Sequence, residues 1–97
     1  MLQAYAKTGN LISAVKYTDE ESIKEIKQMI EDRNGFSVKE TTEEGTFCLI
    51  SVVKLDSDVY TSNSILRKGD YAILNDGSDF RFKSVGQKYF EENYTII

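Results

Sequence analysis

The chain of 97 residues contains no histidine, no proline, no tryptophan and a single cysteine, Cys48. Without an imidazole, nucleophilic catalysis by a Ser–His or Cys–His pair lacks its general base. A zinc site built from clustered cysteine and histidine cannot be assembled either. Cys48 lies inside the apolar run TFCLISVV, which is typical of an inert, packed thiol. We therefore expect no catalytic residues, no bound metal and no cofactor.

Long apolar runs and a basic leader are missing as well. No stretch approaches the roughly 18 apolar residues that a membrane span needs. The first ten residues, MLQAYAKTGN, do not place a basic segment before an apolar one, so we expect no signal peptide. A lone cysteine cannot form an internal disulfide, which suits a reducing compartment. These features predict a protein of the cytoplasm that does not enter a membrane.

The charge is mildly acidic, with a net value of −4, and it is unevenly distributed. Residues 19–44 contain nine acidic and four basic side chains, whereas residues 45–97 are nearly balanced. An acidic chain repels a phosphate backbone, so general binding of nucleic acid is disfavoured. The acidic segment is either a mimic of DNA that binds a host protein or simply a solvated helix face followed by a turn.

The length suits a single compact domain over residues 1–97. The segment TDEESIKEIKQMIEDRNG predicts a helix over 19–33, because its apolar residues recur at intervals of three and four. Thr18 and Glu21 match a capping box at its start, and Asn34-Gly35 offers a left-handed stop at its end. The apolar stripe consists of Ile23, Ile26, Met29 and Ile30.

Elsewhere the apolar residues alternate with a period of two, which predicts strands. The expected strands are 11–17, 36–40, 46–55, a short edge strand at 59–61, and a hairpin over 69–82 that turns at Asp76-Gly77. Residues 85–94 predict a short helix with Val85, Tyr89 and Phe90 facing inward, followed by a closing strand. The fold class is therefore α+β: a mainly antiparallel β-sheet with one long α-helix packed across it and a short C-terminal helix.

Aromatic and basic side chains are the candidate binding groups. Of six tyrosines, Tyr5, Tyr60 and Tyr94 flank polar segments and are interface candidates. The phenylalanines, which are Phe36, Phe47, Phe80, Phe82 and Phe90, are expected in the core.

Four basic residues lie on or beside the expected hairpin. Arg67 and Lys68 precede it, while Arg81 and Lys83 alternate with its phenylalanines and so share its outer face. Such cations can hold a phosphate or pair with an acidic partner. They can equally serve as edge charges that prevent aggregation.

Several short motifs resemble a widespread family of small phage and prophage proteins. Ala14-Val15-Lys16-Tyr17-Thr18 is similar to that family's early EAVQW strand, with tyrosine in place of tryptophan. Gly69-Asp70-Tyr71-Ala72-Ile73 resembles its GDYII segment, and Phe90 to Tyr94 resembles its closing FExxY segment. Ser84-Val85-Gly86 stands where the family usually has a proline. The resemblance spans residues 11–97 and implies a phage origin and an accessory role, without a defined activity.

Two binding functions follow as expectations. The first is a phage-type accessory protein that binds and inhibits a host protein, for instance one of antiphage defence, through Glu25, Glu31, Tyr5, Tyr60 and Tyr94. The second is an oligomeric sponge that sequesters a nucleotide second messenger. There Arg67, Lys68, Arg81 and Lys83 would bind phosphate while a tyrosine stacks on the base. Several short strands have edges to protect, so we expect a homo-oligomer, most simply a dimer.

Overall fold

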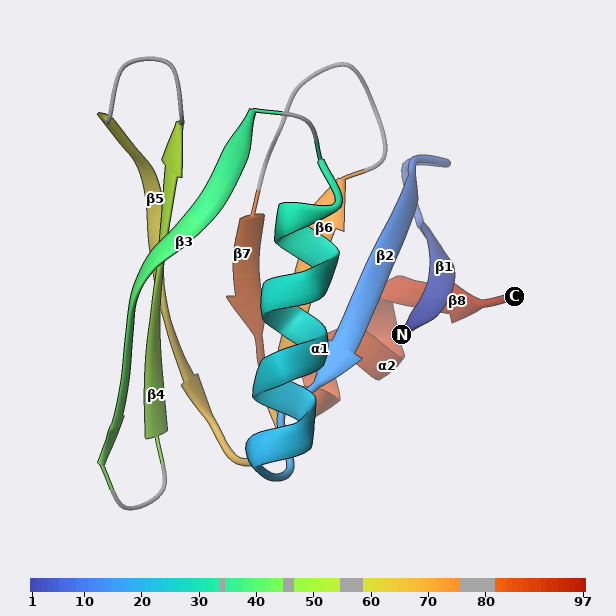
Figure 1. Ribbon diagram of the computed structural model, residues 1–97. Coiled ribbons are helices and arrows are strands. Elements are labelled where there is room, and N and C mark those ends of the chain that lie inside the picture. The colour runs from blue at the N-terminus through green and yellow to red at the C-terminus, as the bar shows by residue number, and fades with distance from the viewer. Residues whose placement is uncertain (34, 45–46, 55–58, 76–81) are drawn as a thin grey trace.

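The computed structural model describes residues 1–33, 35–44, 47–54, 59–75 and 82–97, and they form an α+β structure (Figure 1). The described strands and helices are, in chain order, β1 (Leu2–Ala6), β2 (Leu11–Lys16), α1 (Glu20–Glu31), β3 (Phe36–Glu44), β4 (Phe47–Lys54), β5 (Val59–Arg67), β6 (Tyr71–Asn75), β7 (Phe82–Val85), α2 (Gln87–Asn93) and β8 (Tyr94–Ile96).

The strands form two sheets, where the sequence predicts one. The five-stranded sheet has the order β7-β6-β2-β1-β8, and the three-stranded sheet has the order β3-β4-β5. Every strand pairing in both sheets is antiparallel, as expected. β4, which is expected to be central, is the middle strand of the smaller sheet. The chain leaves the five-stranded sheet after β2, forms the three-stranded sheet with β3, β4 and β5, and returns to the five-stranded sheet at the turn between β5 and β6.

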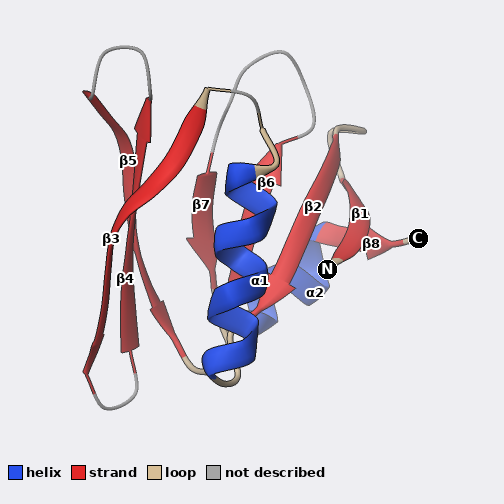
Figure 2. Ribbon diagram, in the orientation of Figure 1, coloured by secondary structure: helices blue, strands red, loops and turns tan. Residues whose placement is uncertain are grey.

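Helix α1 lies in the space between the two sheets (Figure 2). Its apolar stripe, predicted from the spacing, is buried against both of them. We call this contact region the main core; its members include Val15, Tyr17, Ile26, Ile30, Ile50, Val52, Leu66, Leu74 and Phe82. Cys48 belongs to the main core and is fully buried, in agreement with a packed thiol.

The helix is shorter than predicted, because its caps differ from those expected. α1 has 12 residues, Glu20–Glu31, so the prediction of a long helix over 19–33 is wrong. The N-cap is Asp19, whose carboxylate accepts a hydrogen bond from the Ser22 N–H at 3.0 Å, while the Ser22 hydroxyl accepts one from the Asp19 N–H at 3.1 Å. The capping box is thus Asp19–Ser22 and not Thr18–Glu21. At the other end, the C-cap is Asp32, so the helix ends before the expected stop at Asn34-Gly35, although Gly35 has the expected left-handed conformation, with φ of 92°.

Three strands differ from the prediction. β1 is not predicted at all, since LQAYA offers only small or isolated apolar residues. β3 continues to Glu44 through a segment predicted as a turn. β5 has nine residues instead of three, because its polar run pairs with β4 along its whole length. The predicted turn Asp76-Gly77, together with Phe80 and Arg81, lies outside the described residues.

Helix α2 covers the face of the five-stranded sheet that is opposite α1 (Figure 1). Phe90 is 1% exposed and anchors α2 in a second core with Ala4, Ile12, Ala14, Tyr71 and Ile73. Tyr89 is 50% exposed, so its predicted inward orientation is wrong. A helix of two turns has room for one deeply buried aromatic ring, and here that ring belongs to Phe90.

The observed caps lead to a stability prediction for α1. Replacing Asp19 by alanine removes the acceptor for the Ser22 N–H and is expected to lower the free energy of unfolding by about 1 kcal/mol. Thr18→Ala should change it by no more than about 0.5 kcal/mol, since Thr18 is not the cap. Urea denaturation of both variants measures the difference. If Thr18→Ala lowered the free energy of unfolding more than Asp19→Ala does, the cap would be Thr18, as the sequence predicts.

Candidate functional site

An aromatic column lies between α2 and the five-stranded sheet. The rings of Tyr71 and Phe90 stack with centroids 3.9 Å apart and planes 8° apart. Phe90 and Tyr94 stack in turn, at 5.0 Å and 17°. The Lys16 ammonium group lies 5.9 Å from the centroid of the Tyr71 ring, at the other end of the column. Each ring pair contributes roughly 0.5–1.5 kcal/mol beyond its buried area, so the column fixes the position of Tyr94.

Tyr94 borders a groove on this face of the sheet. The groove consists of two adjoining hollows of about 250 and 180 Å³, which share Ala6, Thr8, Lys83 and Tyr94. We call it the lysine–tyrosine groove; its other lining residues are Lys7, Asn10, Ile12, Ile73, Asn75, Tyr89 and Asn93. Its floor is provided by β1, β2 and β6, and its rim by the β1–β2 turn, β7 and the end of α2.

The groove has a chemical character unlike that of the rest of the chain. Lys7 and Lys83 both line it, and no carboxylate occurs among its described lining residues, although the chain carries a net charge of −4. Asn10, Asn75 and Thr8 add uncharged donors and acceptors. Tyr89 and Tyr94 add ring surface, with centroids 6.5 Å apart and planes tilted by 57°. This combination suits a small ligand that has an anionic group and a flat ring.

Of the three predicted cations that the structure describes, one, Lys83, lines this groove. Lys83 is exposed on β7, as predicted, and it is directly opposite Ile73 of β6. Arg67 and Lys68 are exposed but lie before the Tyr71 end of β6, whereas the groove lies at the Asn75 end. The expected cluster of four is therefore not assembled by the described residues, since the turn separates Arg67 and Lys68 from Lys83. Arg81 lies outside the described part of the chain.

The predicted partner-binding residues are also dispersed. Tyr94 is half-buried in the column and lines the groove, while Tyr5 is exposed on β1 and faces the opposite side of the sheet. Glu25 and Glu31 are exposed on α1, about a third of a turn apart around its axis. Tyr60, in β5, is paired with Val53 of β4, and the structure does not describe its side chain.

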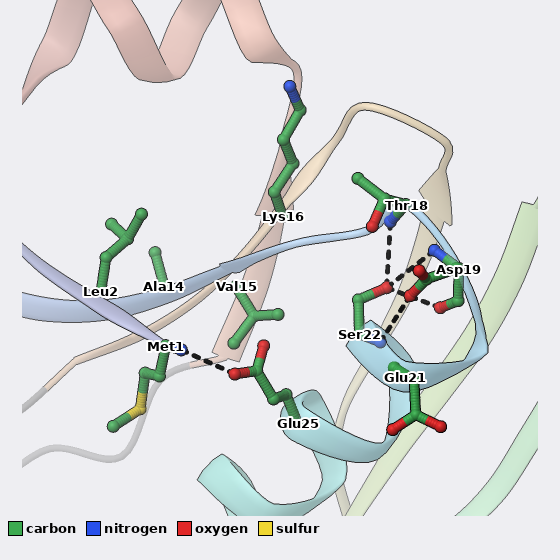
Figure 3. A pocket seen from close by; sticks show the side chains of 10 residues that line it. All are labelled: Met1, Leu2, Ala14, Val15, Lys16, Thr18, Asp19, Glu21, Ser22 and Glu25. Atoms are coloured by element: carbon green, nitrogen blue, oxygen red, sulfur yellow. Dashed lines mark hydrogen bonds and ion pairs between the residues drawn. The ribbon is translucent and has the colours of Figure 1, made fainter.

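Glu25 borders a second hollow, of about 540 Å³, between α1 and the start of the chain (Figure 3). Its carboxylate accepts a hydrogen bond from the amino group of Met1 at 2.8 Å, and both groups are about half exposed. Lys16 also borders this hollow, but its side chain points away from Glu21 and Glu25 (Figure 3). The hollow is larger than either part of the groove, yet its charged groups are of both signs and partly paired. We therefore regard the lysine–tyrosine groove as the better candidate.

The sequence gives no signal for two members of the groove. Lys7 follows β1, a strand that is not predicted, and it lines the same hollow as Lys83 because β1 and β7 lie in one sheet. Tyr89 is predicted to face the core, whereas it is exposed at the groove. A correct helical phase for α2, with Phe90 alone facing inward, would have placed Tyr89 beside Tyr94.

Comparisons of the chain with protein-family models, with curated proteins and with solved structures find no match. Within the described ranges, no group of three or more cysteine or carboxylate side chains is arranged to hold a metal ion. Neither α1 nor α2 is long and apolar enough to cross a membrane. The groove and the exposed surfaces are therefore the features of the molecule that indicate its function.

Because Phe90 is the buried centre of the aromatic column, its loss should be costly. We expect Phe90→Ala to lower the free energy of unfolding by about 3–5 kcal/mol, through lost burial and the cavity that remains. Its neighbour Tyr89 is exposed in the same helix, so Tyr89→Ala should cost no more than about 1 kcal/mol. Guanidinium denaturation followed by circular dichroism gives both values. Equal losses would mean that α2 is not held by Phe90.

Proposed function

We propose that this protein is a non-catalytic binding protein whose lysine–tyrosine groove takes up a small anionic ligand with a planar ring, such as a nucleotide. The observation that carries the proposal is the presence of both Lys7 and Lys83 in the lining of a groove whose described lining has no carboxylate. Two ammonium groups attract phosphate as point charges, and a charge-assisted hydrogen bond is stronger than a neutral one.

The aromatic side chains support a ring-bearing ligand over a bare anion. Stacking of a nucleobase on an aromatic side chain contributes about 1–3 kcal/mol and depends little on the base. Tyr94 is held in place by Phe90, so little ordering of its ring would be required on binding. Tyr89, which is exposed beside it, provides a second ring surface.

Sequestration is the role that agrees best with these residues. The groove offers ammonium, amide, hydroxyl and phenol groups, and the only thiol of the chain is buried in the main core. Such a set can hold a ligand, and it lacks a nucleophile activated by a base. Together with the resemblance to small phage proteins, this supports an accessory protein that lowers the level of a nucleotide signal in the cytoplasm of a bacterial host.

A second candidate is stoichiometric inhibition of a host protein through the outer face of α1. The supporting observation is the row of exposed carboxylates on this helix, Glu20, Glu21, Glu25, Glu31 and Asp32. However, the other side chains exposed on α1 are Lys24 and Gln28, which are also polar. Tight protein interfaces usually depend on buried aromatic or arginine anchors, so this face alone is the weaker candidate.

If the groove binds a nucleotide, the two lysines that line it should contribute more to the affinity than lysines elsewhere on the surface. Titration calorimetry with a panel of mononucleotides, dinucleotides and cyclic dinucleotides should detect binding of at least one class. The double variant Lys7→Gln, Lys83→Gln should weaken it by roughly 10- to 100-fold per lysine. The double variant Lys54→Gln, Lys68→Gln removes the same charge from exposed positions outside the groove, and it should bind nearly as the wild type does.

Two results would contradict the proposal that the lysine–tyrosine groove binds the ligand. Equal weakening in both double variants would indicate a general charge effect. Retention of a protein, and of no phosphorylated small molecule, after exposure to bacterial extract would favour the inhibitor instead, as native mass spectrometry can establish. In that case charge reversal at Glu25 and Glu31 should slow association with the retained protein.

A further inference from the structure

Strand β8 forms one outer edge of the five-stranded sheet. On one side it pairs with β1, in the register Ala4↔Ile96, Tyr5↔Thr95 and Ala6↔Tyr94. No described strand pairs with its other side. The side chains of Tyr94, Thr95, Ile96 and Ile97 are uncharged, and those of Ile96 and Ile97 are 55% and 69% exposed.

The hydrogen bonds to β1 show which main-chain groups of β8 are left for a partner. The Lys7 N–H donates to the Asn93 carbonyl, and the Ile97 N–H donates to the Gln3 carbonyl, both at 3.1 Å. In an antiparallel pair, alternate residues direct both main-chain groups to the same neighbour. Residues 93, 95 and 97 therefore face β1, and residues 94 and 96 face the open side.

At the open side, one of these groups is already engaged. The Tyr94 N–H donates to the Phe90 carbonyl at the end of α2. The Tyr94 carbonyl and both main-chain groups of Ile96 remain directed outward. In an identical strand that runs in the opposite direction, the Ile96 N–H of each copy can donate to the Tyr94 carbonyl of the other.

The other outer strands of the two sheets either carry charged residues or lie against another strand. β3 has four charged residues, Lys39, Glu40, Glu43 and Glu44, and charges along an edge are a common barrier to strand addition. β7 and β5, which end the two sheets on facing sides, lie against each other, and the Ser84 hydroxyl donates to the Ile65 carbonyl at 3.0 Å. Among the described edges, β8 is thus the one that has no charged side chain and no strand against its outer side.

We propose that β8 pairs with β8 of a second copy of this chain, antiparallel about a two-fold axis between the two Thr95 residues. The Ile96 N–H then donates to the carbonyl of the partner's Tyr94, and symmetry repeats this bond. The two five-stranded sheets become one continuous sheet, and the exposed isoleucines are covered. A second copy fits better than a charged foreign strand, because an uncharged edge adds no repulsion between two chains that each carry a net charge of −4.

This dimer is independent of any ligand, but it has a geometric consequence for the groove. Ile96 and Tyr94 lie on the same face of β8, since they alternate with Thr95. In the proposed register, Ile96 therefore lies beside the partner's Tyr94. Both lysine–tyrosine grooves then open on the same face of the combined sheet.

Light scattering tests the assembly directly. The chain has a mass of 11.1 kDa, and the wild type is expected to show twice this mass at high micromolar concentration. Ile96→Lys places a charge at the proposed interface and should give the monomer mass. Ile65→Lys is the matched control, because Ile65 is 51% exposed on β5, and it should leave the dimer intact. A monomeric wild type, or a control that dissociates as Ile96→Lys does, would overturn the proposal.

Cross-linking tests the register and does not depend on how Ile96→Lys folds. Thr95 would face the partner's Thr95 as a non-hydrogen-bonded pair, in which side chains approach most closely. Thr95→Cys should therefore form a disulfide-linked dimer on mild oxidation. Thr18→Cys, exposed before α1, should not. A dimer in which Thr95→Cys fails to cross-link would mean that the copies meet through another surface.

Discussion

The arrangement of both sheets depends on two hydrogen bonds at the end of β2. The Tyr17 N–H donates to the Asp70 carbonyl, and the Gly69 N–H donates to the Tyr17 carbonyl, both at 2.8 Å. Residues 69 and 70 belong to the turn in which the chain passes from the three-stranded to the five-stranded sheet, and Tyr17 itself is fully buried in the main core. Tyr17 thus holds the end of β2, and with it the start of α1, against the turn that joins the two sheets. Gly69 suits this turn because its φ is 98°, which a side chain would strain.

The parts of the fold that the sequence predicts are those specified by local patterns. The stripe of Ile23, Ile26, Met29 and Ile30 needs only helical spacing, and β4 and β6 are continuous apolar runs. β1 is missed because alanine has weak strand propensity. Ala4 suits its position for a tertiary reason: it is fully buried in the core beneath α2. The second sheet is missed because the polar residues of β5 resemble a loop until β4 pairs with them.

The candidate site was less accessible to sequence reasoning, because it depends on long-range pairing. Lys83 could be recognised as an outward cation from its alternation with Phe82, but its partner Lys7 lies near the other end of the chain. Arg67 and Lys68 are close to the hairpin in sequence, and proximity along the chain was the only basis for grouping them with Lys83. The stacking of Tyr94 on Phe90 likewise requires the helical phase of α2, which two turns do not define.

The strand order also determines when each sheet can form. β3, β4 and β5 are consecutive in the chain, so their pairing is local and can begin early. In contrast, the central strand β2 pairs with β6, and Ala4 of β1 pairs with Ile96 of β8, which joins opposite ends of the chain. During synthesis from the N-terminus, β1 and β2 can pair with each other early, but their pairing with β8 and β6 must wait until those strands have been made. Before β6 is made, α1 and the three-stranded sheet can already cover Val15 and Tyr17, with which they share the main core.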